Sequence, residues 1–384
     1  MISWPSDFSQ RFAAVKILNL SRTCLETLPD GIRGMSELRC LVLEDVGMGA
    51  LPHWMSELQL TELTISSGTI RETWWHDSAS GRSKREPTVE EKQGSETLVR
   101  RRHALEAWLW SAETRLPITL ERLTVKWVET DTTQLPPCIR YLTNLRSLSC
   151  VNIWKLIQYL VGSDLPGWLS GLTHLTSFQH TGQASQQSAT VLGSMSLECL
   201  DIYAESYGNW VHQLPSLLAP NNAIRTSLRV LKFGGDCVMT ELPLCLRHLQ
   251  LTALDLDGSD KLNTLPEWLG EMPLEYLGLC MCMGVSRLPV SLRQVSTLRL
   301  IDTCFSSLGF SEFDEPAEQL EELVRMEAEL LPLSASVQQL KFRIASDETY
   351  MDVGWCGGVW DPVLQPRLLE EIRQEVLVLV GDGH

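Results

Sequence analysis

The feature that most constrains the fold of this chain is a six-residue apolar pattern, L-x-x-L-x-L, between residues 228 and 300. Its copies there begin at Leu228, Leu251, Leu274 and Val295, at steps of 23, 23 and 21 residues. A Leu-Pro dipeptide keeps a step of 23, beginning at Leu242, Leu265 and Leu288. Self-similarity at a fixed period in the twenties indicates one short structural unit stacked many times.

Within one copy of the pattern, the last two apolar residues are two positions apart, the period of side chains on one face of a strand. Leu254 and Leu256 therefore point inward, and Asp255 and Asp257 point outward onto the solvated face. One coil cannot bury its apolar edge alone, so neighbouring coils must stack. The pattern predicts an α/β solenoid: a leucine-rich repeat horseshoe with a concave parallel β-sheet, an irregular or helical convex side and about 12 to 13 repeats.

The pattern also occurs outside the regular block, and its interruptions divide the chain. Further copies begin at Val15, Leu38, Leu60, Leu120, Leu145, Leu175, Leu197 and Val337. The step from Leu60 to Leu120 is 60 residues, which indicates a long insertion. The expected divisions are an N-terminal cap (1–14), repeats 1–3 (15–68), a partly disordered insertion with one helix (69–115), central repeats (116–302), an acidic helical insertion (303–331) and irregular terminal repeats (332–384).

Each insertion has two interpretations. The apolar spacing within 96–110, beside Arg100, Arg101 and Arg102, predicts a basic helix that either docks a partner or packs on the convex side. Residues 311–330 carry eight acidic residues against Arg325 alone. That acidic helix either recruits a basic partner or is a solvated helix face.

Charge and composition exclude several classes of function. The net charge of −16 argues against a nucleic-acid-binding surface, which is normally basic. The first residues lack the basic and apolar regions of a secretory signal, and no run of 18 apolar residues is present, so no membrane span is expected. Cys40, Cys150 and Cys199 fall in strand segments as small apolar residues, which favours reduced thiols and a cytoplasmic protein.

A longer pattern, L-P-x-W-[LM]-[SG], begins at Leu51, Leu165 and Leu265. It resembles the leucine-rich repeats of plant-type intracellular immune receptors and of Ras-group cytoplasmic scaffolds. In such families the repeat domain recognises a partner or holds a partner domain inactive. No G-x-x-x-x-G-K-[ST] phosphate loop accompanies it, so the resemblance implies recognition without a nucleotide switch in this chain.

Little in the sequence indicates catalysis. Cys280 and Cys282 form half of a metal-ligand pair without a second half, and the repeat register gives Cys282 a structural role. Cys356 lies in a glycine-rich stretch with no assignable histidine partner. We therefore expect no enzyme, no metal site and no cofactor.

The sequence predicts a non-catalytic scaffold or recognition module in intracellular signalling, with a protein partner on the concave face. The alternative is the ligand-sensing part of an immune-type receptor whose nucleotide-binding domain is encoded elsewhere. Reversing both Asp255 and Asp257 to Lys is expected to abolish partner capture without unfolding. An uncovered C-terminal repeat would also allow self-association. The predicted partner-binding residues, outward by register, are Lys126, Trp127, Asp201, Tyr203, Lys232, Asp255, Asp257, Tyr276 and Arg299.

Overall fold

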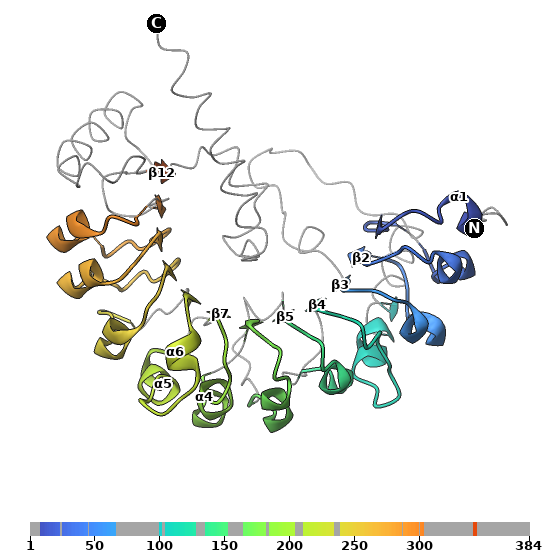
Figure 1. The fold of residues 1–384 in the computed structure, drawn as a ribbon, viewed down its shortest axis with the longest axis horizontal. Coiled ribbons are helices and arrows are strands. Elements are labelled where there is room, and N and C mark those ends of the chain that lie inside the picture. Colours follow the sequence, from blue (N-terminus) through green and yellow to red (C-terminus); the bar gives the residue numbers. More distant parts are fainter. Residues whose placement is uncertain are drawn as a thin grey trace, which may run out of the picture.

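The chain winds into an arc of stacked coils, with strands along the inner edge and helices along the outer edge (Figure 1). This is a computed structural model. It describes residues 8–23, 25–44, 46–66, 100–101, 104–127, 135–152, 164–181, 184–203, 210–233, 239–285, 287–298, 300–302 and 341–343.

Within the described residues, the inner edge is one parallel sheet of twelve strands in sequence order. Each coil contributes one strand, so every strand from β2 to β11 pairs with the strand of the coil before it and of the coil after it. The parallel solenoid predicted from the repeat period is confirmed. The strands are β1 (Ile17–Asn19), β2 (Cys40–Glu44), β3 (Glu62–Ser66), β4 (Arg122–Trp127), β5 (Ser147–Asn152), β6 (Ser177–Thr181), β7 (Cys199–Tyr203), β8 (Val230–Lys232), β9 (Ala253–Asp255), β10 (Tyr276–Gly278), β11 (Leu300–Asp302) and β12 (Lys341–Arg343).

Short 3-10 helices form most of the outer edge, each beginning directly after a Leu-Pro dipeptide. The prolines at these starts have φ between −53° and −77°, the range that the pyrrolidine ring imposes. Proline therefore fixes the point at which each coil turns back toward the next strand. These helices are η1 (Asp30–Gly34), η2 (His53–Glu57), η3 (Pro137–Tyr141), η4 (Gly167–Gly171), η5 (Leu244–His248), η6 (Glu267–Glu271) and η7 (Val290–Gln294).

Longer convex segments form α-helices instead. Helices α4 (Gln186–Gly193) and α5 (Trp210–Leu217) lie side by side on the convex side of the central coils, followed by α6 (Ile224–Ser227) (Figure 1). The α5 residues Trp210, Leu214 and Leu217, at helical spacing, are completely buried. A further short helix, α1 (Phe8–Arg11), precedes the first strand within the predicted N-terminal cap.

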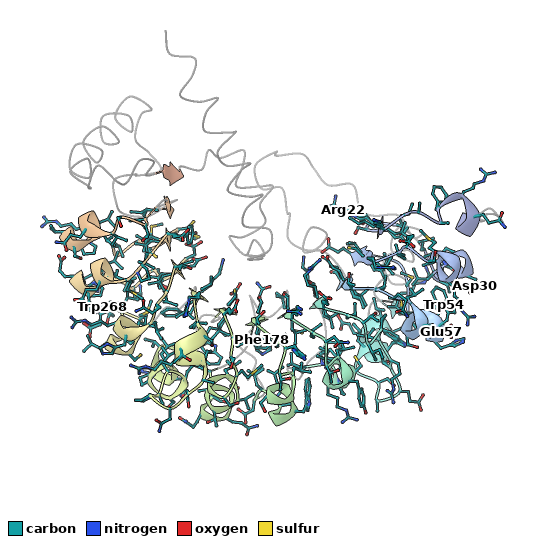
Figure 2. All side chains as sticks on the ribbon, in the orientation of Figure 1. Arg22, Asp30, Trp54, Glu57, Phe178 and Trp268 are labelled. Carbon is teal, nitrogen blue, oxygen red and sulfur yellow. The ribbon has the colours of Figure 1, made fainter. Side chains whose placement is uncertain are left out.

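The core runs the length of the solenoid as a ladder of inward side chains. Phe178, labelled in Figure 2, takes the place of a leucine and is paired across the sheet with Leu148 and Leu200. These residues occupy the fourth position of the L-x-x-L-x-L pattern. Ten residues at this position are at most 1% exposed: Leu41, Leu63, Leu123, Leu148, Phe178, Leu200, Leu231, Leu254, Leu277 and Ile301.

Neighbouring convex helices are joined by polar bonds that connect residues 24 positions apart. Trp54 donates its Nε1 hydrogen to Asp30 Oδ1 at 3.1 Å, and Arg33 pairs with Glu57 at 2.5 Å, so both bonds connect η1 to η2 (Figure 2). Arg247 and Glu271 connect η5 to η6 in the same way, at 2.7 Å. We call these the cross-coil bonds. Trp54, the tryptophan of the first L-P-x-W pattern, is 4% exposed and thus packs between coils.

The eighth pattern position has a left-handed backbone in three coils. Gly258 has φ 76°, and Arg22 and Met281 have φ 57° and 58°. Glycine adopts this conformation without steric cost, whereas arginine and methionine do not. The turn that follows the strand therefore carries backbone strain in two coils that lie far apart along the solenoid.

The helix expected at 96–110 is present at residues 104–109. Leu105 and Leu109 are 1% exposed and belong to the main core, and Arg101 pairs with Glu26 at 2.5 Å. The helix forms the convex part of the third coil, between β3 and β4 (Figure 1). These contacts favour the interpretation in which the insertion helix packs on the convex side.

Two strand registers predicted from the sequence are wrong. Tyr276 is paired with Leu300 and Leu277 with Ile301, so the pattern of this coil begins at Leu298, three residues after the predicted Val295. Ile301 in turn is paired with Phe342, two residues after the predicted Leu340. Val295 and Leu298 are both buried apolar residues, so leucine spacing alone did not distinguish the two registers.

Several predictions fall outside the described residues: the insertion up to residue 99, the acidic helix within 303–331, the segment after residue 343 and Cys356. In the ranges that the structure covers, no helix has the length and apolar character needed to span a bilayer.

Candidate functional site on the concave face

The concave face is organised in rows, because equivalent residues of successive coils lie side by side across the sheet. We name the central row, at the fifth pattern position, the middle row. From β1 to β4 its members are small or uncharged, and from β6 to β9 they are long or charged. From β1 to β10 the middle row consists of Asn19, Val42, Thr64, Thr124, Ser149, Gln179, Asp201, Lys232, Asp255 and Gly278, and the backbone pairing continues it through Asp302 and Arg343 in β11 and β12.

Polar contacts lie along the middle row in two groups, one from β5 to β7 and one from β8 to β9. Ser149 Oγ donates to Gln179 Oε1, and Gln179 Nε2 donates to Asp201 Oδ2 at 2.8 Å. Lys232 Nζ lies 3.0 Å from Asp255 Oδ2, and each of these two side chains is 7% exposed. The centre of the concave face therefore contains a buried ion pair instead of solvated charges.

Burial and neighbouring charges act in opposite directions on these groups. Burial raises the pKa of Asp201 to about 6, although the Lys232 charge partly opposes the shift. For Lys232, burial alone would lower the pKa, but Asp255 and Asp201 outweigh it and the pKa is raised. Lys232 therefore stays charged, and the raised pKa of Asp201 makes proton binding to its carboxyl part of the folded state.

An apolar strip lies beside the charged part of the middle row. Cys199, Val230 and Ala253 are 3%, 8% and 3% exposed and pack together apart from the main core, with half-buried Tyr276 against them. A Cβ atom at Gly278 would lie 2.6 Å from Asp255 Oδ1 and 2.8 Å from Tyr276 Oη. Glycine at this position therefore lets the tyrosine hydroxyl and the carboxylate approach the strand closely.

The two aspartates of the ninth coil also bind the backbone. Asp255 Oδ1 accepts from Asp257 N at 3.1 Å, and Asp257 Oδ1 accepts from Cys280 N in the next coil at 2.9 Å. Replacing both with lysine would put an ammonium group beside Lys232 and remove both bonds. Asp255 is 5% exposed, so the sequence-based expectation that it is solvated is wrong. We therefore expect the double reversal to destabilise the fold as well as to change the charge of the concave face.

The N-terminal half of the concave face has half-exposed ion pairs on either side of the middle row. Arg122 and Glu62, in neighbouring strands, lie 2.7 Å apart with side chains 35% and 34% exposed. Lys126 reaches Glu44 two strands away at 2.9 Å, with exposures of 29% and 36%. Near this edge, burial and the Glu62 charge raise the pKa of Cys40 to about 11, so its thiol stays protonated.

The predicted partner-binding residues fall into three groups. Lys126, Asp257 and Tyr276 are half-buried on the concave side. Asp201, Lys232 and Asp255 adjoin one another and are buried. The side chains of Trp127 and Tyr203, at the ends of β4 and β7, and the whole of Arg299 lie outside the described residues.

Sequence reasoning missed four other polar residues of the concave face. Glu44 pairs with Lys126 and Gln179 donates to Asp201, whereas Glu62 and Arg122 pair with each other. Opposite charges at equivalent positions of neighbouring coils were the available signal, as in Glu62 and Arg122.

The described cysteines, Cys280 and Cys282 among them, are free thiols. Cys282 is fully buried and its Sγ lies 3.3 Å from the carbonyl oxygen of Leu256, in the structural position that the register predicted. Burial raises its pKa to about 12. Within the described ranges, no group of three or more His, Cys, Asp or Glu residues is arranged to hold a metal ion.

The decisive observation for classification is that each L-x-x-L-x-L copy supplies one parallel strand and each Leu-Pro begins a convex turn. The chain has the leucine-rich repeat fold. No family model and no curated protein matches the sequence.

Three solved structures are similar to this chain. A leucine-rich repeat protein of Leptospira interrogans is 19% identical, with a TM-score of 0.43 over 89% of this chain and 74% of that one. The leucine-rich repeat domain of the type III effector XopL is 18% identical, with a TM-score of 0.31 over 87% and 79%. TLR13, solved as a TLR13–ssRNA13 complex, is 13% identical, with a TM-score of 0.36 over 89% and 58%.

Proposed function

We propose that this leucine-rich repeat chain is a non-catalytic interaction module that holds a protein partner against its concave face, as a cytoplasmic scaffold in signalling. The observation that carries the proposal is the arrangement of the concave charges. Arg122 and Lys126 are each held by a carboxylate of another coil, while 35% and 29% of their side chains stay accessible. Side chains fixed in this way lose little conformational entropy when a partner binds.

The concave residues have different roles in this proposal. Lys126, Asp257 and Tyr276 are accessible enough to contact the partner, and Trp127 and Tyr203 are contacts by their sequence position. Arg299 was assigned to this face from the register that begins at Val295, which is wrong, so it is not among the proposed contacts. Asp201, Lys232 and Asp255 hold the strands beneath these contacts in place instead of touching the partner. Tyrosine, tryptophan and arginine are the residue types that most often dominate binding energy.

The test is partner capture by the full chain, compared between two variants. In the concave variant, Lys126→Glu is combined with Tyr276→Ala, and we expect it to lose the proteins that the unmodified chain enriches. The convex control is Arg247→Gln, which removes an exposed arginine on the opposite side and should enrich the same proteins. Thermal unfolding verifies that both variants fold. Enrichment of the same partners by the concave variant would contradict the proposal.

A further inference from the structure

An exposed basic and aromatic cluster lies on the convex side, away from the concave face. The Arg115 and Arg140 guanidinium carbons lie over the ring of Tyr141, 5.0 Å and 4.6 Å from its centroid. Tyr141, in η3, is 43% exposed, and Ile118, in the turn before β4, is 65% exposed. Two neighbouring coils thus present two cations over one exposed aromatic ring, and an exposed aliphatic side chain follows Arg115 in the segment before β4.

Local hydrogen bonds hold this cluster in place. Arg115 Nη1 donates to the carbonyl oxygens of Ala112 and Thr114, both at 2.8 Å. Arg140 Nη2 donates to Tyr141 Oη, and Asn144 Nδ2 donates to the Ile118 carbonyl oxygen at 3.0 Å. The side chains are therefore ordered before any partner arrives, which lowers the entropy cost of binding.

The charges of the cluster are not neutralised locally. In the described part of the chain, neither Arg115 nor Arg140 has a carboxylate within 4.0 Å. Five other arginines do, namely Arg33, Arg101, Arg122, Arg146 and Arg247. Arg39 and Arg229 also have no carboxylate within 4.0 Å among the described residues, so what distinguishes Arg115 and Arg140 is that both lie over one exposed ring. They form a local positive cluster in a protein of net charge −16.

We propose that Arg115, Ile118, Arg140 and Tyr141 form a docking surface for an acidic peptide segment of a protein partner. Guanidinium groups match carboxylates with paired hydrogen bonds, and both retain free donors for this purpose. Tyr141 and Ile118 provide apolar contact for a side chain between the acidic residues. The acidic remainder of the protein repels such a segment, so electrostatics directs it to this surface.

The experiment measures binding of a fluorescein-labelled acidic peptide, built of glutamate with leucines, to the full chain by fluorescence anisotropy at low salt. We expect saturable binding below about 1 mM that weakens as salt is added. Combined Arg115→Gln and Arg140→Gln should weaken it by about tenfold, as should Tyr141→Leu. Combined Arg115→Lys and Arg140→Lys keeps the charge but loses the planar fork, and should weaken binding by a smaller factor.

The matched control combines Arg39→Gln with Arg229→Gln. These arginines also donate from Nη1 to backbone carbonyls, so the control removes the same charge elsewhere. We expect it to bind the peptide like the unmodified chain, and a peptide with glutamine in place of glutamate not to bind. The proposal is overturned if the acidic peptide shows no saturable binding, or if the control variant loses as much affinity as the Arg115 and Arg140 variants. It is also overturned if the Gln or Leu variants bind the peptide undiminished, or if only a phosphoserine peptide binds.

Discussion

The two halves of the concave face each contain an ion pair between neighbouring strands, but the pair is half-exposed in one half and buried in the other. Toward the N-terminus, Arg122 and Glu62 keep about a third of each side chain in contact with solvent, at 35% and 34% exposure. In the central coils, Lys232 and Asp255 are 7% exposed. Both pairs join neighbouring parallel strands, so strand register alone does not set the burial of a concave charge.

The difference comes from the row that the charges occupy. Arg122 and Glu62 flank a middle row of threonines, whereas Lys232 and Asp255 stand in the middle row itself. Asp201 lies beside them on one side, and on the other Gly278 leaves room for the Tyr276 hydroxyl to approach Asp255. An exposed pair is screened by water and contributes about 0–1 kcal/mol to stability. A buried pair interacts strongly but costs several kcal/mol of lost hydration, so the whole pair contributes little net stability. Removing only one partner, however, leaves an unpaired buried charge and is strongly destabilising.

The largest effect is expected from Lys232→Met. It leaves the Asp255 carboxylate buried without its cation, which should lower the free energy of unfolding by about 3–5 kcal/mol. Lys126→Met, in the N-terminal half, should cost about 1 kcal/mol or less. Urea unfolding of both variants measures the contrast, and Lys232→Met combined with Asp255→Leu should recover part of the loss. Equal costs for the two lysines would refute the distinction between the halves.

Asp201→Asn is expected to have a smaller effect that depends on pH. Folding raises the pKa of Asp201 from 3.8 to about 6, so the native state binds this proton more tightly than the unfolded state. Proton binding at Asp201 contributes up to about 3 kcal/mol to the free energy of unfolding. This contribution is complete below pH 4 and is lost as the pH rises through 6. The asparagine variant should match the unmodified chain at pH 4 and exceed its stability at pH 8. Parallel stability curves across this range would exclude the assignment.

The convex tryptophans provide a third contrast of about 1 kcal/mol. Trp54 donates a hydrogen bond to Asp30, whereas Trp268, similarly buried, has no hydrogen-bond partner in the described part of the chain. Trp54→Phe should therefore destabilise more than Trp268→Phe by about one hydrogen bond. The urea midpoints of the two variants measure this difference in stability. The difference should vanish when both variants are made in an Asp30→Ala background.

The smallest expected effect is a gain in stability. Arg22→Gly and Met281→Gly relieve left-handed backbone strain at equivalent positions in the two regions, and each should stabilise by about 0.5–1 kcal/mol. Because the two φ angles are nearly equal, the gains should agree. Gly258→Ala should lower the stability in the same thermal assay. A loss of stability in both Arg22→Gly and Met281→Gly would show that backbone strain at these two positions is unimportant.

Most of the fold was predictable from the sequence because inward leucines recur with a fixed spacing. The pattern located β1 to β10, and the Leu-Pro dipeptides marked where the 3-10 helices begin. It failed at β11, where Val295, Leu298 and Leu300 permit two registers. Only pairing with Tyr276 and Leu277 distinguishes them, which is a contact between coils and not a property of one coil.

The candidate site was less predictable than the fold. Strand alternation correctly placed Asp201, Lys232 and Asp255 side by side on one face, but it did not reveal that they are buried. Burial depends on the length of the side chains in the coils before and after, and on the curvature that brings them together. The Arg115 and Tyr141 cluster likewise joins two convex segments with no shared pattern.

The cross-coil bonds have a consequence for chimeric solenoids. Asp30 and Trp54, or Arg247 and Glu271, belong to different coils, so a single coil does not contain its own complement of polar partners. Transplanting one coil would sever such bonds at two junctions, whereas a graft of two adjacent coils would carry one junction intact. The smallest exchangeable module is therefore a pair of coils, although the sequence repeats once per coil.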